Sequence, residues 1–206
     1  MPDYDLDNAY RIDGPDSARR HYDAWAGTYD DSFARDWGYI APREIAALFR
    51  AGFDGSGPVL DIGAGTGEVA RHLDGLTVDG IDISPEMLAQ AERKGLYRRR
   101  ILGDLTRPLD IPDARYAGVI SCGTFTHGHV GPECLPELLR ITRPGARFTC
   151  GTIPAVLDGA GFGSALALLV AQGQITPVRF HDIAIYDGSD HPHAADRGLV
   201  MDFIRL

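Results

Sequence analysis

The chain has 206 residues, 44% of them hydrophobic and 24% charged, which is typical of a globular protein with one core, and no apolar run approaches the ~20 residues that span a bilayer. Twenty-nine acidic residues against twenty basic ones give a formal net charge of −9, which disfavours sequence-independent binding to the phosphates of nucleic acid. The three cysteines, Cys122, Cys134 and Cys150, have neither the number nor the spacing of a disulfide framework or a zinc knuckle.

The amino terminus, MPDYDLDNAY, is acidic and lacks the basic and apolar regions of a secretion signal, so we expect a cytoplasmic protein. Residues 16–51 are predicted to be helical, with Asp16 or Ser17 capping the start. Gly38 and Pro42 are expected to break this stretch before a second helix that ends at Gly52.

Aromatic side chains recur along the first of these helices at spacings of three and four residues, which places them on one face. They are Tyr22, Trp25, Tyr29 and Phe33. We expect Trp25 to be structural and Tyr22 or Tyr29 to lie near a ligand, because a helix laid across a crevice presents such rings to it. The alternative is that this aromatic face only packs on a sheet and contacts no ligand.

Beyond a Gly-rich joint at residues 52–58, apolar runs alternate with helical stretches. The predicted strands cover residues 58–62, 77–83, 97–102, 116–122, 146–152, 177–186 and 198–205. The predicted helices cover residues 66–73, 85–94, 132–142 and 160–172. This order predicts a Rossmann-like α/β fold, a mostly parallel sheet with helices on both faces.

The last two strands are joined by the polar stretch DGSDHPHAADRG, so an antiparallel hairpin is expected at one edge of the sheet. The arginines of YRRRI, residues 97–101, are expected to protect an edge strand from pairing. We predict one domain over residues 1–206, with a helical cap at residues 1–52 and the sheet at residues 58–206.

The stretch VLDIGAGTGEVARHL, residues 59–73, places three glycines between a strand and a helix-like segment. Such a turn can hold a dinucleotide pyrophosphate, hold another nucleoside cofactor, or serve close packing. The dinucleotide fingerprint requires G-x-G-x-x-G, but here Glu68 occupies the position of the third glycine. A carboxylate there disfavours a pyrophosphate.

Asp82 closes the next strand, nineteen residues after Gly63, where an acidic side chain accepts hydrogen bonds from ribose hydroxyls. Ile83 and Met87 flank it with apolar surface suited to a flat base. The alternative assigns Asp82 to a strand-end turn and the two apolar residues to the core. The spacing from the glycine loop favours the ribose interpretation.

Four motifs occur in a fixed order: VLDIGAGTG, GIDISPEMLAQA, GDLTRPLDIPDARYAGVIS and LLRITRPGARFTC. In this order they resemble the class I S-adenosylmethionine-dependent methyltransferases, and the resemblance covers nearly the whole chain. The stretch YDAWAGTYD, residues 22–30, is similar to the amino-terminal helix that closes over the cofactor in a subgroup acting on small molecules. The resemblance implies a seven-stranded sheet with one antiparallel strand inserted near an edge.

The resemblance also implies roles around S-adenosylmethionine. At the methionine end it implies contacts by Gly63 and Gly65, by Asp61 to the amino group, by the Ser121 carbonyl to the ammonium, and by Tyr22 or Tyr29 to the carboxylate. At the nucleoside end, Asp82 would bind the ribose, Ile83 would pack on the adenine, Asp104 would receive the adenine amino group and Leu105 would pack beside it. The acidic residues Asp61, Glu68, Asp82 and Asp104 around the loop suit a cofactor that carries an ammonium and a sulfonium.

The stretch SCGTFTHGHVGPE, residues 121–133, leaves the fourth strand at the crevice where open parallel sheets bind ligands. His127 is the candidate general base, because imidazole titrates near neutral pH. The alternative is that His127 only shapes the pocket through a hydrogen bond and that His129 is a surface loop residue. His191 and His193 flank a proline without a third ligand, so no metal site is expected.

We therefore predict methyl transfer from S-adenosylmethionine to a small molecule, leaving S-adenosylhomocysteine. The short cap and the short segment between strands five and six disfavour a large acceptor, while the acceptor atom and the oligomeric state stay open. The alternatives are the same fold in non-methylating chemistry, a nicotinamide-dependent oxidoreductase, and a non-enzymatic partner of another methyltransferase.

Overall fold

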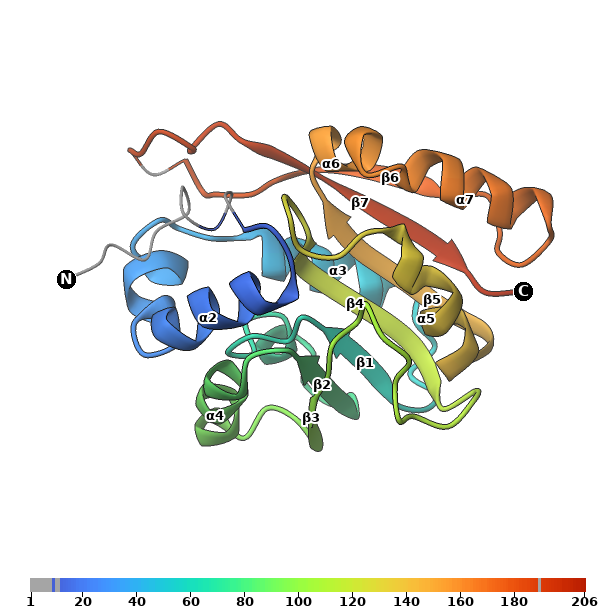
Figure 1. The fold of residues 1–206 in the computed structure, drawn as a ribbon, viewed down its shortest axis with the longest axis horizontal. Coiled ribbons are helices and arrows are strands. Elements are labelled where there is room, and N and C mark those ends of the chain that lie inside the picture. Colours follow the sequence, from blue (N-terminus) through green and yellow to red (C-terminus); the bar gives the residue numbers. More distant parts are fainter. Residues whose placement is uncertain (1–8, 10–11, 189) are drawn as a thin grey trace.

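The structure, a computed structural model, describes residues 9, 12–188 and 190–206 of the chain. These residues form a seven-stranded sheet in the order β3-β2-β1-β4-β5-β7-β6 (Figure 1). The strands are β1 (Val59–Ile62), β2 (Val78–Asp82), β3 (Arg99–Leu102), β4 (Tyr116–Phe125), β5 (Thr142–Thr152), β6 (Arg179–Ala184) and β7 (Arg197–Ile204).

Strands β1 to β5 run parallel, and β7 is antiparallel to both of its neighbours, β5 and β6. The last strand in sequence is thus inserted one place from the edge, as the resemblance implies. The predicted Rossmann-like α/β fold is confirmed. At the opposite edge, β3 carries exposed arginines, and Arg98 beside it pairs with the buried Asp79 at 2.6 Å.

Helices follow the predicted order, with two differences in the sheet-covering layers. The helix α4 (Pro85–Lys94) matches its prediction, and the 3-10 helix η3 (Pro132–Cys134) with α5 (Leu135–Ile141) matches the stretch 132–142. The helix expected over 160–172 is two helices, α6 (Pro154–Gly159) and α7 (Phe162–Ala171).

The helix predicted over residues 66–73 is wrong. Turns occupy this stretch, and the only helical part is the 3-10 helix η2 (Ala70–His72). Gly67, whose φ of 95° is incompatible with a right-handed helix, prevents the helix from starting at residue 66. The glycine loop therefore ends in turns instead of opening a helix.

The amino-terminal part contains α2 (Pro15–Trp25), the π-helix η1 (Asp30–Arg35) and α3 (Ala41–Gly52). Capping by Asp16 or Ser17 is wrong, because both residues lie inside the helix. Its N-cap is Gly14 and its first residue is Pro15. Helix α3 packs against β4 and β5 and so covers a face of the sheet. The part that lies beyond the strand ends, beside α4, is α2 (Figure 1); we call α2 and η1 the cap.

Separate apolar clusters cover the two faces of the sheet. One contains Leu138 of α5 and Phe162 of α7, and the other contains Phe49 of α3 and Leu88 of α4. A third cluster, formed by residues that include Trp25, Phe33 and Tyr186, joins the cap to the loop after β6. The cap is therefore held over the carboxyl ends of the strands by its own small core.

Candidate active site

Two adjoining cavities lie between the cap and the carboxyl ends of β1, β2 and β4. The glycine-loop cavity encloses about 790 Å³ and the aromatic cavity about 740 Å³, open solvent included. They share Tyr22, Tyr29, Cys122 and Gly123. Open parallel sheets bind ligands at this edge, so the position agrees with the general rule for such folds.

Asp82 lies at the end of β2 and faces the glycine-loop cavity. Its Oδ2 accepts a hydrogen bond from the backbone N–H of Gly65 at 2.8 Å, and its Oδ1 accepts one from Ser84 at 2.8 Å. Burial raises the pKa of Asp82, and these backbone donors oppose that shift. Each oxygen keeps a further lone pair, so the carboxylate can still accept hydrogen bonds from a ligand.

The glycine loop forms the wall beside Asp82, with Gly63 and Gly65 lining the cavity. Gly63 has a φ of 63°, and a Cβ atom there would lie 2.0 Å from Thr124 Oγ1. A side chain at this position would collide with β4. The loop thus exposes bare backbone to the cavity, as close approach by a cofactor requires.

The facing wall is apolar except for one carboxylate. Ile83, the buried Met87 and the buried Leu105 line it together with Asp104. Asp104 Oδ1 accepts hydrogen bonds from the N–H of Thr106 at 2.9 Å and from its hydroxyl at 2.6 Å. The structure therefore brings together all the residues predicted for the nucleoside end.

Asp61 lies under the loop, outside both cavities. Its Oδ2 accepts a hydrogen bond from the Tyr97 hydroxyl at 2.7 Å, while its buried Oδ1 has no hydrogen-bond partner among the described residues. Burial raises the pKa of Asp61 to about 7. Such an unsatisfied acceptor suits a site completed by a donor or a cation from outside the chain.

Two of the residues expected around the loop, Ser121 and Glu68, line neither cavity. Ser121 lies inside β4, which runs three residues further than predicted, and its hydroxyl donates to Ile62 O at 3.0 Å. Cys122, Gly123 and Thr124 line the cavity in its place. Glu68 points away to the surface, where it pairs with Arg71 and Lys94.

His129 lines the glycine-loop cavity, whereas His127 lies outside both cavities. His129 Nδ1 lies 2.6 Å from the carbonyl oxygen of His127, so this nitrogen is the N–H donor of the neutral ring. Nε2 then accepts the hydrogen bond from the Tyr22 hydroxyl at 2.9 Å. Burial lowers the pKa of His129, so the ring is neutral at pH 7. Of the two histidines, His129 is thus the one that lines the glycine-loop cavity, and the catalytic role of His127 stays a prediction.

Tyr22 and Tyr29 line both cavities, and Trp25 is buried. The structure also assigns a role to two acidic residues that the sequence reasoning missed. Asp23 accepts a hydrogen bond from the Ser84 hydroxyl at 2.6 Å, and Asp30 accepts one from Thr66 at 2.5 Å. The available signal was the repeated Tyr-Asp pair at the two ends of YDAWAGTYD.

Asp30 also pairs with Lys94 of α4 at 2.5 Å. Together, the Asp23 and Asp30 contacts, which we call the clasp, tie the cap to the strand ends. The clasp holds the two tyrosines over the cavities.

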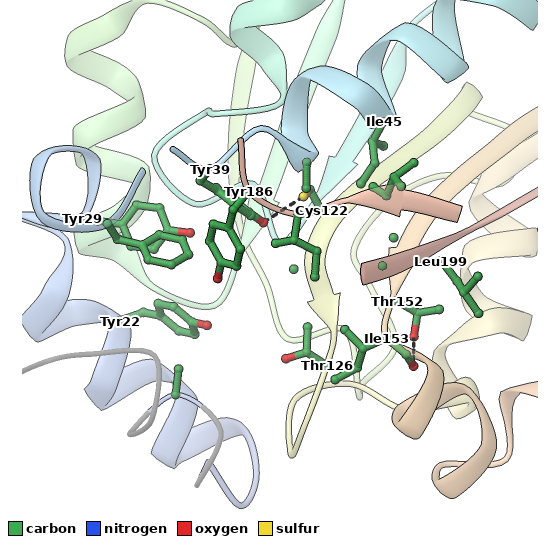
Figure 2. A pocket seen from close by; sticks show the side chains of 18 of the residues that line it. Tyr22, Tyr29, Tyr39, Ile45, Cys122, Thr126, Thr152, Ile153, Tyr186 and Leu199 are labelled. Atoms are coloured by element: carbon green, nitrogen blue, oxygen red, sulfur yellow. Dashed lines mark hydrogen bonds between the residues drawn. The ribbon is translucent and has the colours of Figure 1, made fainter. Parts of the chain in front are cut away.

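The aromatic cavity receives Tyr39 and Tyr186, which the sequence reasoning also missed (Figure 2). They come from loops far apart in the chain that meet in an isolated β-bridge. The Tyr39 hydroxyl lies 2.9 Å from Cys122 Sγ. Since both tyrosines are in irregular segments, no periodicity could have indicated them.

Within the described ranges, no group of three or more His, Cys, Asp or Glu residues could hold a metal ion. His191 and His193 instead lie against the ring of Trp37, with centroids 4.7 Å and 6.0 Å away. No helix in the described part of the chain is long and apolar enough to cross a membrane.

Residues 60–150 match the family model for a methyltransferase domain. Over this stretch the chain is similar to methyltransferases that use S-adenosylmethionine. Human methyltransferase-like protein 27 is 37% identical over 140 residues, which are 64% of this chain and 56% of that protein. The demethylmenaquinone methyltransferase of Beutenbergia cavernae is 34% identical over 137 residues, 59% of this chain and 55% of that protein. The chain thus spans about half the length of these relatives.

Solved structures share the fold of the methyltransferase domain. The 1,6-didemethyltoxoflavin-N1-methyltransferase of Burkholderia thailandensis, solved with its substrate and S-adenosylhomocysteine, has a TM-score of 0.64 at 24% identity and covers 91% of this chain and 86% of its own. The [4+2]-cyclase SpnF has a TM-score of 0.68 at 16% identity, with coverage of 94% and 97%. These likenesses establish the seven-stranded architecture.

Proposed function

We propose that this protein transfers a methyl group from S-adenosylmethionine to a small molecule. The observation that carries the proposal is Asp82, a carboxylate held by Gly65 N–H beside the bare backbone of Gly63 and Gly65, in a cavity that adjoins a second one. The family match over residues 60–150 supports it.

The residues present fit the cofactor chemically. Asp82 and Asp104 offer acceptors to hydroxyl and amino groups, and Ile83 and Met87 offer apolar surface to a base. Among the described residues, no lysine or arginine lines the glycine-loop cavity. Such a lining favours a cationic ligand over a phosphate.

The chain's own contribution to the reaction is alignment and exclusion of water. Bound S-adenosylmethionine supplies a methyl group on a positively charged sulfur. Tyr22 and Tyr29 cover the junction of the two cavities, where donor and acceptor must meet. The clasp keeps these rings in place.

We propose His129, acting through Tyr22, in place of His127 as the group that takes up a proton from the acceptor. Its hydrogen bond to the Tyr22 hydroxyl and its neutral ring support this assignment. Tyr22 contributes a hydroxyl at the junction of the cavities, and His129 positions and polarises that hydroxyl.

Of the arguments against a dinucleotide cofactor, one is weakened by the structure and another is added. Glu68 does not line the cavity and is paired with Arg71 and Lys94, which weakens its argument against a pyrophosphate. However, the turns over residues 66–73 provide no helix N-terminus to bind one. The likeness to a cyclase keeps non-methylating chemistry as the second candidate.

Calorimetric titration with S-adenosylmethionine, S-adenosylhomocysteine and NAD tests the proposal. We expect both sulfur nucleosides to bind and NAD not to bind. Binding of NAD alone would contradict the proposal, and binding of the sulfur nucleosides without methyl transfer to any acceptor would favour the second candidate. A cytoplasmic location and a single domain over residues 1–206 stay predictions from the sequence.

A further inference from the structure

The aromatic cavity adjoins the glycine-loop cavity along the shared residues Tyr22, Tyr29, Cys122 and Gly123. A molecule in one cavity therefore touches a molecule in the other.

The lining of the aromatic cavity has two walls of different shape (Figure 2). The rings of Tyr22, Tyr29, Tyr39 and Tyr186 form one wall, and the aliphatic side chains of Ile45, Ile153 and Leu199 lie across from them. The lining also includes Trp25, Phe33, Ile183 and Ile185. A flat ligand can stack on the ring wall and present its other face to the aliphatic wall.

No charged side chain lines this cavity among the residues that the structure describes. Burial raises the pKa of Tyr39 well above its ordinary value and raises the pKa of the Cys122 thiol to about 12, so both groups are neutral at pH 7. Their polar atoms bond to each other, and the Thr152 hydroxyl donates to Phe125 O at 3.0 Å. The polar groups of the wall are thus largely satisfied within the protein.

A charged ligand would lose its hydration here without gaining a counter-charge. The carboxylates around the cavity do not line it: Asp82 faces the neighbouring cavity, Asp61 is covered by Tyr97, and Glu68 is paired with Arg71 and Lys94. Aromatic faces attract cations, but a cation in this cavity would face the positive sulfur of bound S-adenosylmethionine. Both signs of charge are therefore disfavoured.

We propose that the aromatic cavity binds the methyl acceptor and selects an uncharged, flat and largely apolar molecule. This inference rests on the proposed function, because it takes the neighbouring cavity as the cofactor site. The inference restricts the class of methyl acceptors from small molecules in general to uncharged, flat ones.

Three probes of matched size test the selection: 2-naphthol, 2-naphthoate and 2-naphthylmethylammonium, titrated at pH 7 with and without saturating S-adenosylhomocysteine. We expect 2-naphthol to bind at least tenfold more tightly than either ion. The Trp25 indole N–H resonance should shift, while Trp37, which lies outside the cavity lining, should not. Equal or tighter binding of an ion, or an unmoved Trp25 resonance, would overturn the inference.

A charge placed in the wall gives a second test. Leu199→Lys puts an ammonium group into the aromatic cavity away from the glycine-loop cavity, and should reverse the preference from 2-naphthol to 2-naphthoate. Leu168→Lys is the matched control, because Leu168 is 58% exposed and lines neither cavity. An unchanged order of probes in folded Leu199→Lys would contradict the inference.

The two proposals fail separately. Absence of S-adenosylhomocysteine binding contradicts the proposed function, while the order of the three probes without it still decides the charge selection. Binding of S-adenosylhomocysteine with tight binding of an ion contradicts only the selection. If Leu199→Lys does not fold, the order of probes on the unchanged protein decides.

Discussion

Asp82 connects three elements through one carboxylate. It holds the glycine loop through Gly65 and the start of α4 through Ser84, and it still faces the cavity. The acceptor atoms are fixed in direction before a ligand arrives, because backbone donors hold both oxygens. A ligand hydroxyl then binds without first ordering the side chain.

Replacing Asp82 with Ala should weaken binding of S-adenosylhomocysteine by about 1–3 kcal/mol, the usual effect of leaving polar groups unpaired. Asp82→Asn, which keeps one acceptor oxygen, should weaken this binding by less than Asp82→Ala does. Calorimetry measures the change. Asp16→Ala is the control, since that side chain is 86% exposed on α2. An unchanged dissociation constant in folded Asp82→Ala would remove Asp82 from the site.

His129→Gln should slow turnover by roughly 10²-fold or more, the usual contribution of a positioned base, and leave affinity for S-adenosylhomocysteine nearly unchanged. Burial and the nearby His21 and His127 lower the pKa of His129, so the ring becomes protonated only below its ordinary titration range. The rate of the unchanged enzyme should therefore fall on the acidic side, and the variant should lack this fall. The measurement is turnover against pH with an acceptor found by screening.

His127→Gln is the matched control, because His127 lies on the same loop outside both cavities. Its pH profile should keep the acidic limb, displaced toward higher pH, because His127 contributes to the lowered pKa of His129. If both variants keep the same acidic limb, His129 does not take up the proton.

At the scale of elements, the cap is a short segment that depends on specific contacts. Its aromatic cluster packs against Tyr186, and the clasp adds the Asp23 and Asp30 contacts to α4 and the glycine loop. Hydrogen bonds to charged groups are each worth about 1.5–3 kcal/mol. The cap should thus open without unfolding of the sheet when the clasp is removed.

The double variant Asp23→Ala, Asp30→Ala should raise amide exchange rates in α2 and weaken S-adenosylhomocysteine binding by about tenfold or more, because one such bond of about 1.5 kcal/mol already corresponds to about tenfold. Hydrogen exchange by mass spectrometry measures the first effect. Asp31→Ala is the control, because Asp31 is 75% exposed and pairs with Arg35 of the same helix. Faster exchange across the whole sheet would show that the clasp supports the entire fold instead.

Element boundaries limited the prediction of the site more than element identity did. The strand β4 runs to Phe125, so the crevice begins after Ser121, and the histidine that reaches it is His129. The helix expected over 66–73 has apolar residues at helical spacing, but Gly67 prevents it. Periodicity reports which residues are buried, whereas a single backbone angle decides where an element stops.

At the scale of the whole molecule, the alternation of apolar runs with helical stretches was sufficient to predict the sheet. Runs of the right length and a polar final connection predict parallel strands followed by a hairpin, and the resemblance places the last strand inside the edge. The aromatic cavity was not predictable in this way. Its walls join Tyr39 to Tyr186 and Ile45 to Leu199, contacts between distant segments that no local pattern encodes.

Asp61 links the site to the stability of the chain. Its folded pKa of about 7 lies above the ~3.9 of an unfolded chain. The stability that the neutral form contributes is complete below the unfolded pKa and is lost as the pH rises through 7. Between pH 5 and pH 8 the unchanged protein should therefore lose roughly 2 kcal/mol of unfolding free energy relative to Asp61→Asn.

Urea unfolding of the two proteins at both pH values measures this difference. Asp54→Asn is the control, because hydrogen bonds from Ser56 lower the pKa of Asp54 and its titration falls below this window. A constant difference between the unchanged protein and Asp61→Asn would mean that Asp61 is ionised throughout.

The insertion of β7 between β5 and β6 sets an order on assembly during synthesis. β6 is made first, yet its partner along the sheet is β7, which leaves the ribosome later. Until then the edge of β5 also lacks its neighbour, although the half of the sheet that carries the glycine loop is already complete. A nascent chain should thus form its cofactor half early and expose an unpaired strand edge for a time, which is the state that chaperones recognise.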